Sequence, residues 1–385
     1  MSVDGSGTIE ARVAIRFGFC NIWVHIFGSP RSKNLEVTWH GIEGHDEVVE
    51  QFRRAVSRGR LASSFLFCGP EGVGKFTFAV KLAQALLCQT RPETALDPCG
   101  ECPACRQVLA GTHPDLEVVA KPKDKSFIPL ELFIGDKEHR GREGLCRSIS
   151  LKPFMGGRKV AVIDDADYLN PEGANALLKT LEEPPPKSVL ILIGTSPAKQ
   201  LPTIRSRCQL IRFRPLPSEV VAGLMISQGI VEDPAEAQRL ADHCEGSLQR
   251  AAELTDAELW TFRNTLLQRL AEEALDSVRL AKAVSVFVDE AGKQPAARRA
   301  RLRQVVHFAT EFYRQLLHVQ SGADRPADTE IRRFVDRALA HRPADGENTA
   351  ARLERCLDAA GQIDRNANQS TLIETWLDDL VRLAW

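Results

Sequence analysis

The stretch Phe65-Leu-Phe-Cys-Gly-Pro-Glu-Gly-Val-Gly-Lys-Phe-Thr77 decides the fold of the first half of this chain. It begins as a short apolar run, passes through three glycines and leads into a helical pattern over residues 78–87. Gly69, Gly74 and Lys75 follow the phosphate-binding loop pattern G-x-x-x-x-G-K, and Gly72 lies between the two glycines of the pattern. Glycines let backbone N–H groups curl around a phosphate, and the next helix adds its positive N-terminal end. The stretch therefore predicts a nucleotide-binding scaffold in which Lys75 reaches the outer phosphates.

The position after the lysine departs from this pattern. A phosphate-binding loop places Ser or Thr there, because the hydroxyl binds Mg²⁺. This chain has Phe76 at that position. Thr77 cannot replace the missing hydroxyl, since one helical step turns a side chain by about 100°. We therefore expect that ATP bound at this loop is not hydrolysed.

The composition limits the classes of function. The chain has 385 residues, enough for two or three domains, and 43% of them are hydrophobic. Its net charge of −1 does not attract nucleic acid, so any DNA contact must come from a local patch. The sequence holds no apolar stretch long enough for a membrane span. A nucleotide loop together with clustered cysteines indicates a reducing environment, and we expect a cytoplasmic protein.

Four of the ten cysteines are spaced as metal ligands. Two consecutive C-x-x-C spacings bring Cys99, Cys102 and Cys105 together, and Cys88, at the predicted end of the preceding helix, can supply a fourth thiolate. Four sulfur ligands with no open position are typical of structural, tetrahedral Zn²⁺. A redox C-x-x-C pair is the first alternative, and free core thiols are the second. We predict a structural zinc module over residues 88–105.

Buried strands and polar strand ends predict a parallel α/β sheet. The expected strands cover residues 65–68, 115–120, 160–163, 188–194 and 209–213, with helices between them. Asp164 and Asp165 follow one strand and Thr195 follows another. The carboxyl ends of such strands form the ligand-binding crevice, where carboxylates can hold Mg²⁺ through water. These three residues therefore join the candidate nucleotide site.

The rest of the chain divides into segments of different character. We expect residues 1–36 to be a disordered extension or the product of a start codon placed too early, with an extra strand as the alternative. Residues 37–214 form the predicted core, and a Pro-rich linker then leads into a helical lid over residues 215–256. Helical spacings such as Ile373/Trp376/Leu380 predict a helical oligomerisation domain over residues 257–385.

Together these motifs resemble the bacterial clamp-loader subunits of the AAA+ class. The resemblance is specific over about residues 38–255 and fainter beyond, where Asn366-Ala-Asn368 is similar to a late family signature. The motifs that carry it are, in chain order, Gly69–Lys75, the four cysteines, Gly111-Thr-His-Pro-Asp115, Ile163-Asp-Asp-Ala-Asp167, Asn175-Ala-Leu-Leu-Lys-Thr-Leu-Glu-Glu-Pro-Pro185 and Ser206-Arg-Cys208.

The resemblance implies a fold, partners and a process. The fold would be an AAA+ five-stranded parallel sheet, like that of phosphate-loop NTPases, with a helical lid and an all-α collar. The collar of this family joins five subunits, so the expected partners are gamma/tau and delta subunits in a pentameric ring. That ring opens a sliding clamp and loads it on primer–template DNA in replication. Any DNA polymerase III activity would belong to the assembly, because this chain shows no polymerase site.

Three departures favour the delta-prime subunit within this family over the ATP-hydrolysing gamma/tau motor. Phe76 replaces the Mg²⁺-binding hydroxyl, and Asp165 stands where the motor has a water-orienting Glu. In the lid, Gln249 stands where the motor has an Arg that senses the γ-phosphate, and Arg250 is displaced by one helical step. The resemblance therefore implies a non-motor subunit with weak or absent ATPase activity, and a gamma/tau-like motor is the alternative.

One arginine keeps its family position. Arg207, in Ser206-Arg-Cys208, matches the arginine finger that acts in trans on a neighbour's ATP. Such fingers are worth about 10³–10⁵ in rate. The alternative is a surface arginine paired with a nearby carboxylate. A third interpretation of the whole chain, a zinc-containing nucleic-acid-binding module, would use the basic cluster at 298–303, but this cluster more simply forms a solvated helix face.

Overall fold

The computed structural model describes residues 39–385 except 123–124, 327, 344, 366 and 384–385. The predicted extension at residues 1–36 lies outside the described residues. The chain divides into two compact units. Within the described residues, one comprises residues 39–120 and 130–255, and the other comprises residues 121–129 and 256–383.

The first unit is built around a five-stranded parallel sheet with the strand order β2-β3-β4-β1-β5. The predicted fold class, an α/β protein with such a sheet and a helical C-terminal region, is confirmed. All five predicted strands are present, and each end differs from the prediction by at most one residue. The strands are β1 (Ser64–Cys68), β2 (Leu116–Val119), β3 (Lys159–Ile163), β4 (Ser188–Gly194) and β5 (Gln209–Arg212).

The register of the central strands gathers their polar ends at one edge. Cys68 of β1 lies opposite Gly194 of β4, and Ile163 of β3 lies opposite Leu192 of the same strand. Every residue of β1, β3 and β4 is buried, as expected for parallel strands covered on both faces. The phosphate loop, Asp164 and Thr195 therefore leave the sheet side by side.

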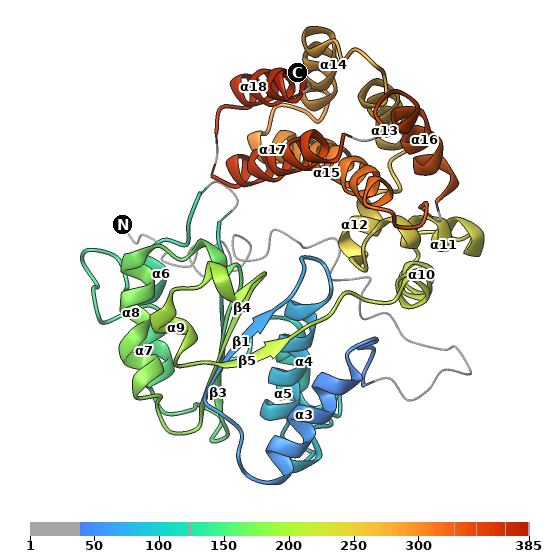
Figure 1. Ribbon diagram of the computed structural model, residues 1–385. Coiled ribbons are helices and arrows are strands. Elements are labelled where there is room, and N and C mark those ends of the chain that lie inside the picture. The colour runs from blue at the N-terminus through green and yellow to red at the C-terminus, as the bar shows by residue number, and fades with distance from the viewer. Residues whose placement is uncertain (1–38, 123–124, 327, 344, 366, 384–385) are drawn as a thin grey trace, which may run out of the picture. The chain divides into compact units, whose positions relative to one another are not determined.

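Helices cover both faces of this sheet (Figure 1). On one face lie α3 (Asp46–Ser57), α4 (Lys75–Leu87) and α5 (Pro103–Leu109). On the other lie α7 (Leu145–Ser150) and α8 (Pro171–Glu182), with α6 (Glu131–Ile134) and α9 (Pro202–Arg205) beside them. The sequence pattern did not predict α6 and α7, because four and six residues are too few to show a helical period.

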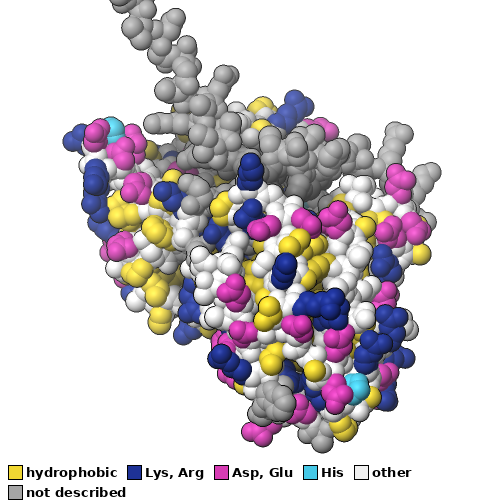
Figure 2. Space-filling view, turned by 90° about the horizontal axis from the view of Figure 1, so that it is seen from above, with side chains coloured by type: hydrophobic (Ala, Val, Ile, Leu, Met, Phe, Trp, Pro, Cys, Tyr) yellow, Lys and Arg dark blue, Asp and Glu magenta, His cyan; other side chains and the backbone are white. Residues whose placement is uncertain are grey.

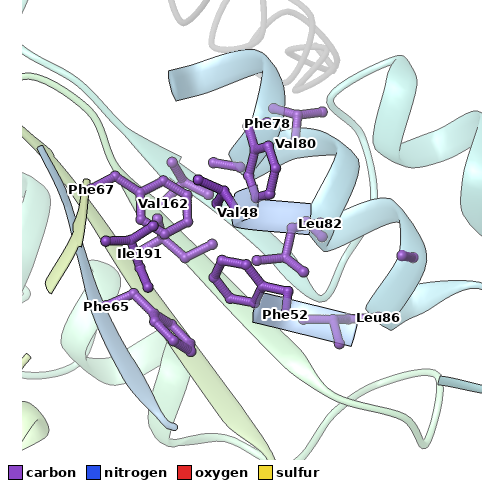
Figure 3. Close-up of a cluster of buried hydrophobic side chains, with 14 of the residues drawn as sticks. Val48, Phe52, Phe65, Phe67, Phe78, Val80, Leu82, Leu86, Val162 and Ile191 are labelled. Carbon is purple, nitrogen blue, oxygen red and sulfur yellow. The ribbon is translucent and has the colours of Figure 1, made fainter. Parts of the chain in front are cut away.

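Aromatic side chains fill the core between the sheet and its first helices (Figure 3). The ring of Phe52 on α3 packs 5.0 Å from Phe65 of β1, and Phe78 of α4 packs 5.9 Å from Phe67. These centroid distances are typical of favourable aromatic pairs. Because α4 begins directly after the phosphate loop, this packing holds the loop in place.

The remaining described elements, after β5, are all helices. The segment predicted to be a lid contains α10 (Ser218–Ser227), α11 (Pro234–His243) and α12 (Leu248–Glu253), which belong to the first unit. The second unit contains α13 (Ala257–Leu270), α14 (Ser277–Asp289), α15 (Pro295–Gln320), α16 (Thr329–His341), α17 (Gly346–Asp364) and α18 (Gln369–Arg382). The predicted stripe Ile373/Trp376/Leu380 is buried in its core. Among the described helices, each is too short or too polar to traverse a lipid bilayer.

Charged side chains of both signs are interspersed over the face seen in Figure 2. This mixture agrees with the balance of 50 basic and 51 acidic residues in the sequence. In the predicted basic cluster, Arg298 forms an ion pair with Asp289 at 3.1 Å, and Arg301 forms one with Asp256 at 3.3 Å. These two guanidinium groups therefore serve contacts within the helical unit.

Candidate functional site

The phosphate loop joins β1 to α4 and has the predicted backbone form. Gly72 and Gly74 take φ values of 73° and 93°, which favour glycine. The Lys75 Nζ donates hydrogen bonds to the carbonyl oxygens of Gly69 at 2.6 Å and Pro70 at 2.5 Å. Burial lowers the pKa of Lys75. The lysine thus binds its own loop, and a phosphate would have to compete with these carbonyls.

The Phe76 side chain packs against the core and cannot act as a metal ligand. Its ring is partly buried and packs against the core cluster between the sheet and α4. The ring contributes apolar contacts, and it has no oxygen atom to offer to Mg²⁺. The substitution therefore replaces a ligand by a packing residue.

The lid lies directly on the phosphate loop. The Leu248 N–H donates to the Gly72 carbonyl oxygen at 3.1 Å. A Cβ atom added to Gly72 would stand only 2.2 Å from the Ser247 Oγ and 2.6 Å from the Gln249 Cβ. Only glycine fits here, so Gly72 serves contact with the lid as well as loop conformation. This contact at the start of α12 was not predicted, since the residues are more than 170 positions apart.

The two lid residues at and beside the motor's sensor position bind carboxylates of the lid. Gln249 donates to the Glu253 carboxylate at 3.2 Å. Arg250, the displaced arginine, forms an ion pair with Glu245 at 2.5 Å. The lid therefore contacts the loop through its backbone, and the Arg250 guanidinium binds a carboxylate of the lid itself.

Asp164 and Asp165 follow β3, and Asp164 lies near Lys75 of the phosphate loop. Asp164 is half-buried, and burial together with the charge of Asp165 raises its pKa to about 6. The backbone of Asp165 is left-handed, with φ of 57°, and its N–H donates to the Asp164 carboxylate at 3.0 Å. Lys75 lies close enough to Asp164 to favour its charged form, although burial and Asp165 outweigh that effect. These residues meet at the predicted edge of the sheet.

Asp167 holds the predicted residue Thr195, a role that sequence reasoning missed. Its carboxylate accepts hydrogen bonds from the Thr195 N–H at 2.8 Å and the Thr195 Oγ1 at 2.5 Å. Gln200 donates to the other carboxylate oxygen at 2.6 Å. The Thr195 hydroxyl proton is therefore used within the protein. The signal for this role was present in Asp-Asp-Ala-Asp167, but the pattern does not rank the three acids.

The four predicted cysteines converge at the other end of α4. The Sγ atoms of Cys88, Cys99, Cys102 and Cys105 all lie within 4.8 Å of one another, and those of Cys99 and Cys105 are 3.9 Å apart. A tetrahedral zinc site with ligands at ~2.3 Å separates its sulfurs by about 3.8 Å. Backbone N–H groups of Cys102 and Glu101 lower the pKa of Cys99 to about 6, which favours a thiolate. The donor set and its spacing fit a structural Zn²⁺.

Buried polar side chains tie this cysteine cluster to α4. The Lys81 Nζ donates to the Gln84 Oε1 at 3.1 Å, and the Gln84 Nε2 donates to the Cys105 carbonyl oxygen at 3.2 Å. Both side chains are over 90% buried. Within the segment 88–105, the Leu96 carbonyl oxygen accepts a hydrogen bond from the Trp39 Nε1 at 2.8 Å. Hydrogen bonds therefore connect the cysteine cluster to α4, the helix that follows the phosphate loop.

Arg207 lies between α9 and β5, far from the phosphate loop of its own chain in sequence. Its Nη2 pairs with the Glu182 Oε1 at 2.7 Å. Its Nη1 donates to the Thr203 carbonyl oxygen at 2.9 Å and to the Ser206 Oγ at 3.2 Å. The side chain is 33% exposed. The structure thus places it at the surface and pairs it with a carboxylate, the arrangement named above as the alternative to a finger.

Comparison with known proteins identifies relatives of the first unit. Residues 44–217 match the family described as "DNA polymerase III, delta subunit". The DNA polymerase III subunit delta' of Pseudomonas aeruginosa is 38% identical over 180 residues, which cover 47% of this chain and 51% of the relative. The subunit tau of Escherichia coli is 33% identical over 57% of this chain and 32% of the relative. The subunit delta' of Bacillus subtilis is 29% identical over 57% of this chain and 62% of the relative.

The chain therefore spans between about a third and two thirds of the length of these curated relatives. The predicted resemblance to clamp-loader subunits is confirmed for the matched region. It lies in the unit that contains the phosphate loop, the cysteine cluster and Arg207.

Proposed function

We propose that this chain, which over residues 44–217 belongs to the DNA polymerase III clamp-loader family, acts as a delta-prime-like subunit. It would complete a ring with gamma/tau and delta subunits and help to load a sliding clamp on primed DNA. In that ring it would offer Arg207 to a neighbour's ATP rather than hydrolyse ATP itself.

The position of Phe76 carries this proposal. Mg²⁺ neutralises charge that develops during phosphoryl transfer, and an oxygen ligand at this position helps to hold it. The Phe76 ring instead packs against the core. Gln249 supports the same conclusion, because an amide at the position of the motor's γ-phosphate-sensing arginine carries no positive charge.

The predicted nucleotide contacts fit a stable scaffold better than a motor. Lys75 binds the loop carbonyls, and Thr195 is held by Asp167. The Leu248–Gly72 hydrogen bond joins the lid to the loop. A motor must open and close this crevice in each cycle, whereas a subunit that supports its neighbours can keep it closed.

The cysteine cluster would support this scaffold. Cys88, Cys99, Cys102 and Cys105 would hold Zn²⁺ in a closed site, where the ion stabilises the fold and activates no water. Because Cys88 caps α4 and Gln84 contacts Cys105, the cluster restrains the helix that carries the phosphate loop.

The test is ATP turnover by the purified full-length chain with Mg²⁺. We expect no hydrolysis above a Lys75→Ala control. Turnover that Lys75→Ala abolishes would instead establish the alternative, a gamma/tau-like motor.

The second test reconstitutes the chain with the motor and delta subunits of its own cell, the sliding clamp and primed DNA. We expect Arg207→Ala to reduce DNA-stimulated ATP turnover at least tenfold, because a neighbour's site loses its finger. Arg205→Ala, two positions earlier on α9, is the control and should leave turnover unchanged. Equal turnover by Arg207→Ala and the unmodified chain would refute the finger.

A further inference from the structure

Arg207 is engaged within its own unit at both terminal nitrogens. The Nη2 binds the Glu182 carboxylate at 2.7 Å, and the Nη1 binds the Thr203 carbonyl oxygen at 2.9 Å. These contacts hold the guanidinium on its own subunit. A movement of the side chain toward a phosphate on another subunit would replace the carboxylate by the phosphate as the acceptor for Nη2.

Glu182 occupies a position that helix electrostatics disfavour. It is the last residue of α8, where the partial negative charge of the helix C-terminus repels a carboxylate. The α8 C-terminus therefore does not account for an acidic residue here. The ion pair with Arg207 does, because the guanidinium offsets both the carboxylate and the helix end.

We propose that Glu182 is a clasp that holds Arg207 against its own subunit until a neighbour's nucleotide phosphate takes the place of the carboxylate. This inference rests on the proposed trans role of Arg207. Glu182 is a positioning residue in this scheme, since it acts only through the arginine and does not touch the nucleotide.

The competition between the two acceptors favours the phosphate. The Glu182 carboxylate is 48% exposed, so water screens its ion pair with Arg207. The terminal phosphate of a nucleotide carries more negative charge and offers three oxygen acceptors in a site that excludes water. Arg207 therefore exchanges partners on assembly, and the carboxylate makes assembly weaker by the strength of one exposed ion pair.

The experiment titrates the full-length chain into a fixed amount of the motor and delta subunits, with clamp, primed DNA and ATP. The two readouts are the half-saturating concentration of the chain and the maximal ATP turnover. Removal of an exposed pair predicts that Glu182→Gln lowers the half-saturating concentration about 1.5- to 5-fold. We expect maximal turnover to stay unchanged, because the engaged finger has already left the carboxylate.

Two controls separate this role from a structural one. Glu183→Gln removes the adjacent carboxylate at the same helix end and should change neither readout. In an Arg207→Ala chain, Glu182→Gln should have no further effect, since the clasp has nothing to hold. Thermal unfolding of each variant establishes that it is folded before the titration.

The outcomes separate the clasp from the proposed function. If Arg207→Ala lowers turnover but Glu182→Gln leaves the half-saturating concentration unchanged, the clasp is wrong and the finger stands. If Glu182→Gln lowers maximal turnover as Arg207→Ala does, the carboxylate aims the finger and the clasp is again wrong. If Arg207→Ala has no effect on turnover, both proposals fail.

Discussion

The two ends of α4 differ in the ligand-binding residues beside them. At its N-terminus the glycines and Lys75 keep the backbone form of a phosphate loop, but Phe76 lacks the hydroxyl that holds Mg²⁺. At its C-terminus all four cysteines are present, and their sulfurs lie within 4.8 Å of one another. One end therefore has a binding shape without its catalytic ligand, and the other end has a complete set of ligands.

This difference shows that packing and chemistry can change independently. The loop keeps its form because α4 packs against β1 and because the lid binds Gly72. Neither contact needs catalysis. The cysteine cluster differs, because four converging thiolates are typical of a structural Zn²⁺ whose binding itself contributes to the folding free energy. We expect substitutions at the two ends to differ accordingly.

The largest effect is expected from Cys102→Ala/Cys105→Ala. This change removes two of four ligands, so the protein should lose its metal and much of the binding free energy, which is about 10–16 kcal/mol for structural zinc in small domains. Elemental analysis should fall from about one equivalent of zinc to none, and the thermal midpoint should drop sharply. Cys146→Ala, outside the cluster, is the control. A metal-free unmodified protein with normal stability would contradict the zinc assignment.

A stabilising effect is expected from Asp164→Asn. Burial and Asp165 raise the pKa of Asp164 to about 6, so the folded state binds this proton more tightly than the unfolded state. The protonated carboxyl therefore favours folding below about pH 4, and this advantage is lost as the pH rises through 6. We expect the variant to unfold at higher denaturant concentration at pH 7.5, by about 1–3 kcal/mol, and to equal the unmodified protein near pH 4.

Denaturation of Asp164→Asn at the same two pH values can also contradict this prediction. A variant that is less stable at pH 7.5 would show that Asp164 has a compensating cation. The charged form of Asp164 would then be stabilised beside the phosphate loop.

A smaller effect is expected from Lys81→Met. Lys81 is buried on α4, and it contacts Gln84, which binds the Cys105 carbonyl oxygen. Loss of a direct hydrogen-bond partner of a metal ligand lowers affinity by about 10- to 100-fold, and Lys81 is one hydrogen bond further away, so we expect a decrease of less than about tenfold. Competition with a zinc chelator measures this change, and the exposed Lys199→Met is the matched control. Unchanged affinity would show that the cluster does not depend on the α4 side chains.

Sequence patterns predicted the sheet well, for a physical reason. The strands 160–163 and 188–194 are runs of apolar residues, and a parallel strand buried on both faces needs such a run. The cysteine cluster was also predictable, because two C-x-x-C spacings constrain three ligands locally. Patterns were weaker where elements are short or capped. The helix α8 begins at Pro171 rather than Asn175, and α4 begins at Lys75 rather than Phe78.

Contacts between distant positions were not predictable in the same way. Asp167 binds Thr195 across 28 positions, and Glu182 binds Arg207 across 25. No periodicity links such residues, and many carboxylates in the sequence could have served. Which acid meets which partner depends on how the ends of β3, β4 and α8 come together.

The amino-acid sequence by itself thus specified the phosphate loop, its missing hydroxyl, the four thiols and the alternation of strands and helices. These features depend on residues that are neighbours in sequence or that repeat with a short period. Folding in three dimensions was needed to join Gly72 to the lid, Thr195 to Asp167 and Arg207 to Glu182. Hydrogen bonds and ion pairs act over a few ångströms, so such partners are selected only once the packed core has brought their elements together.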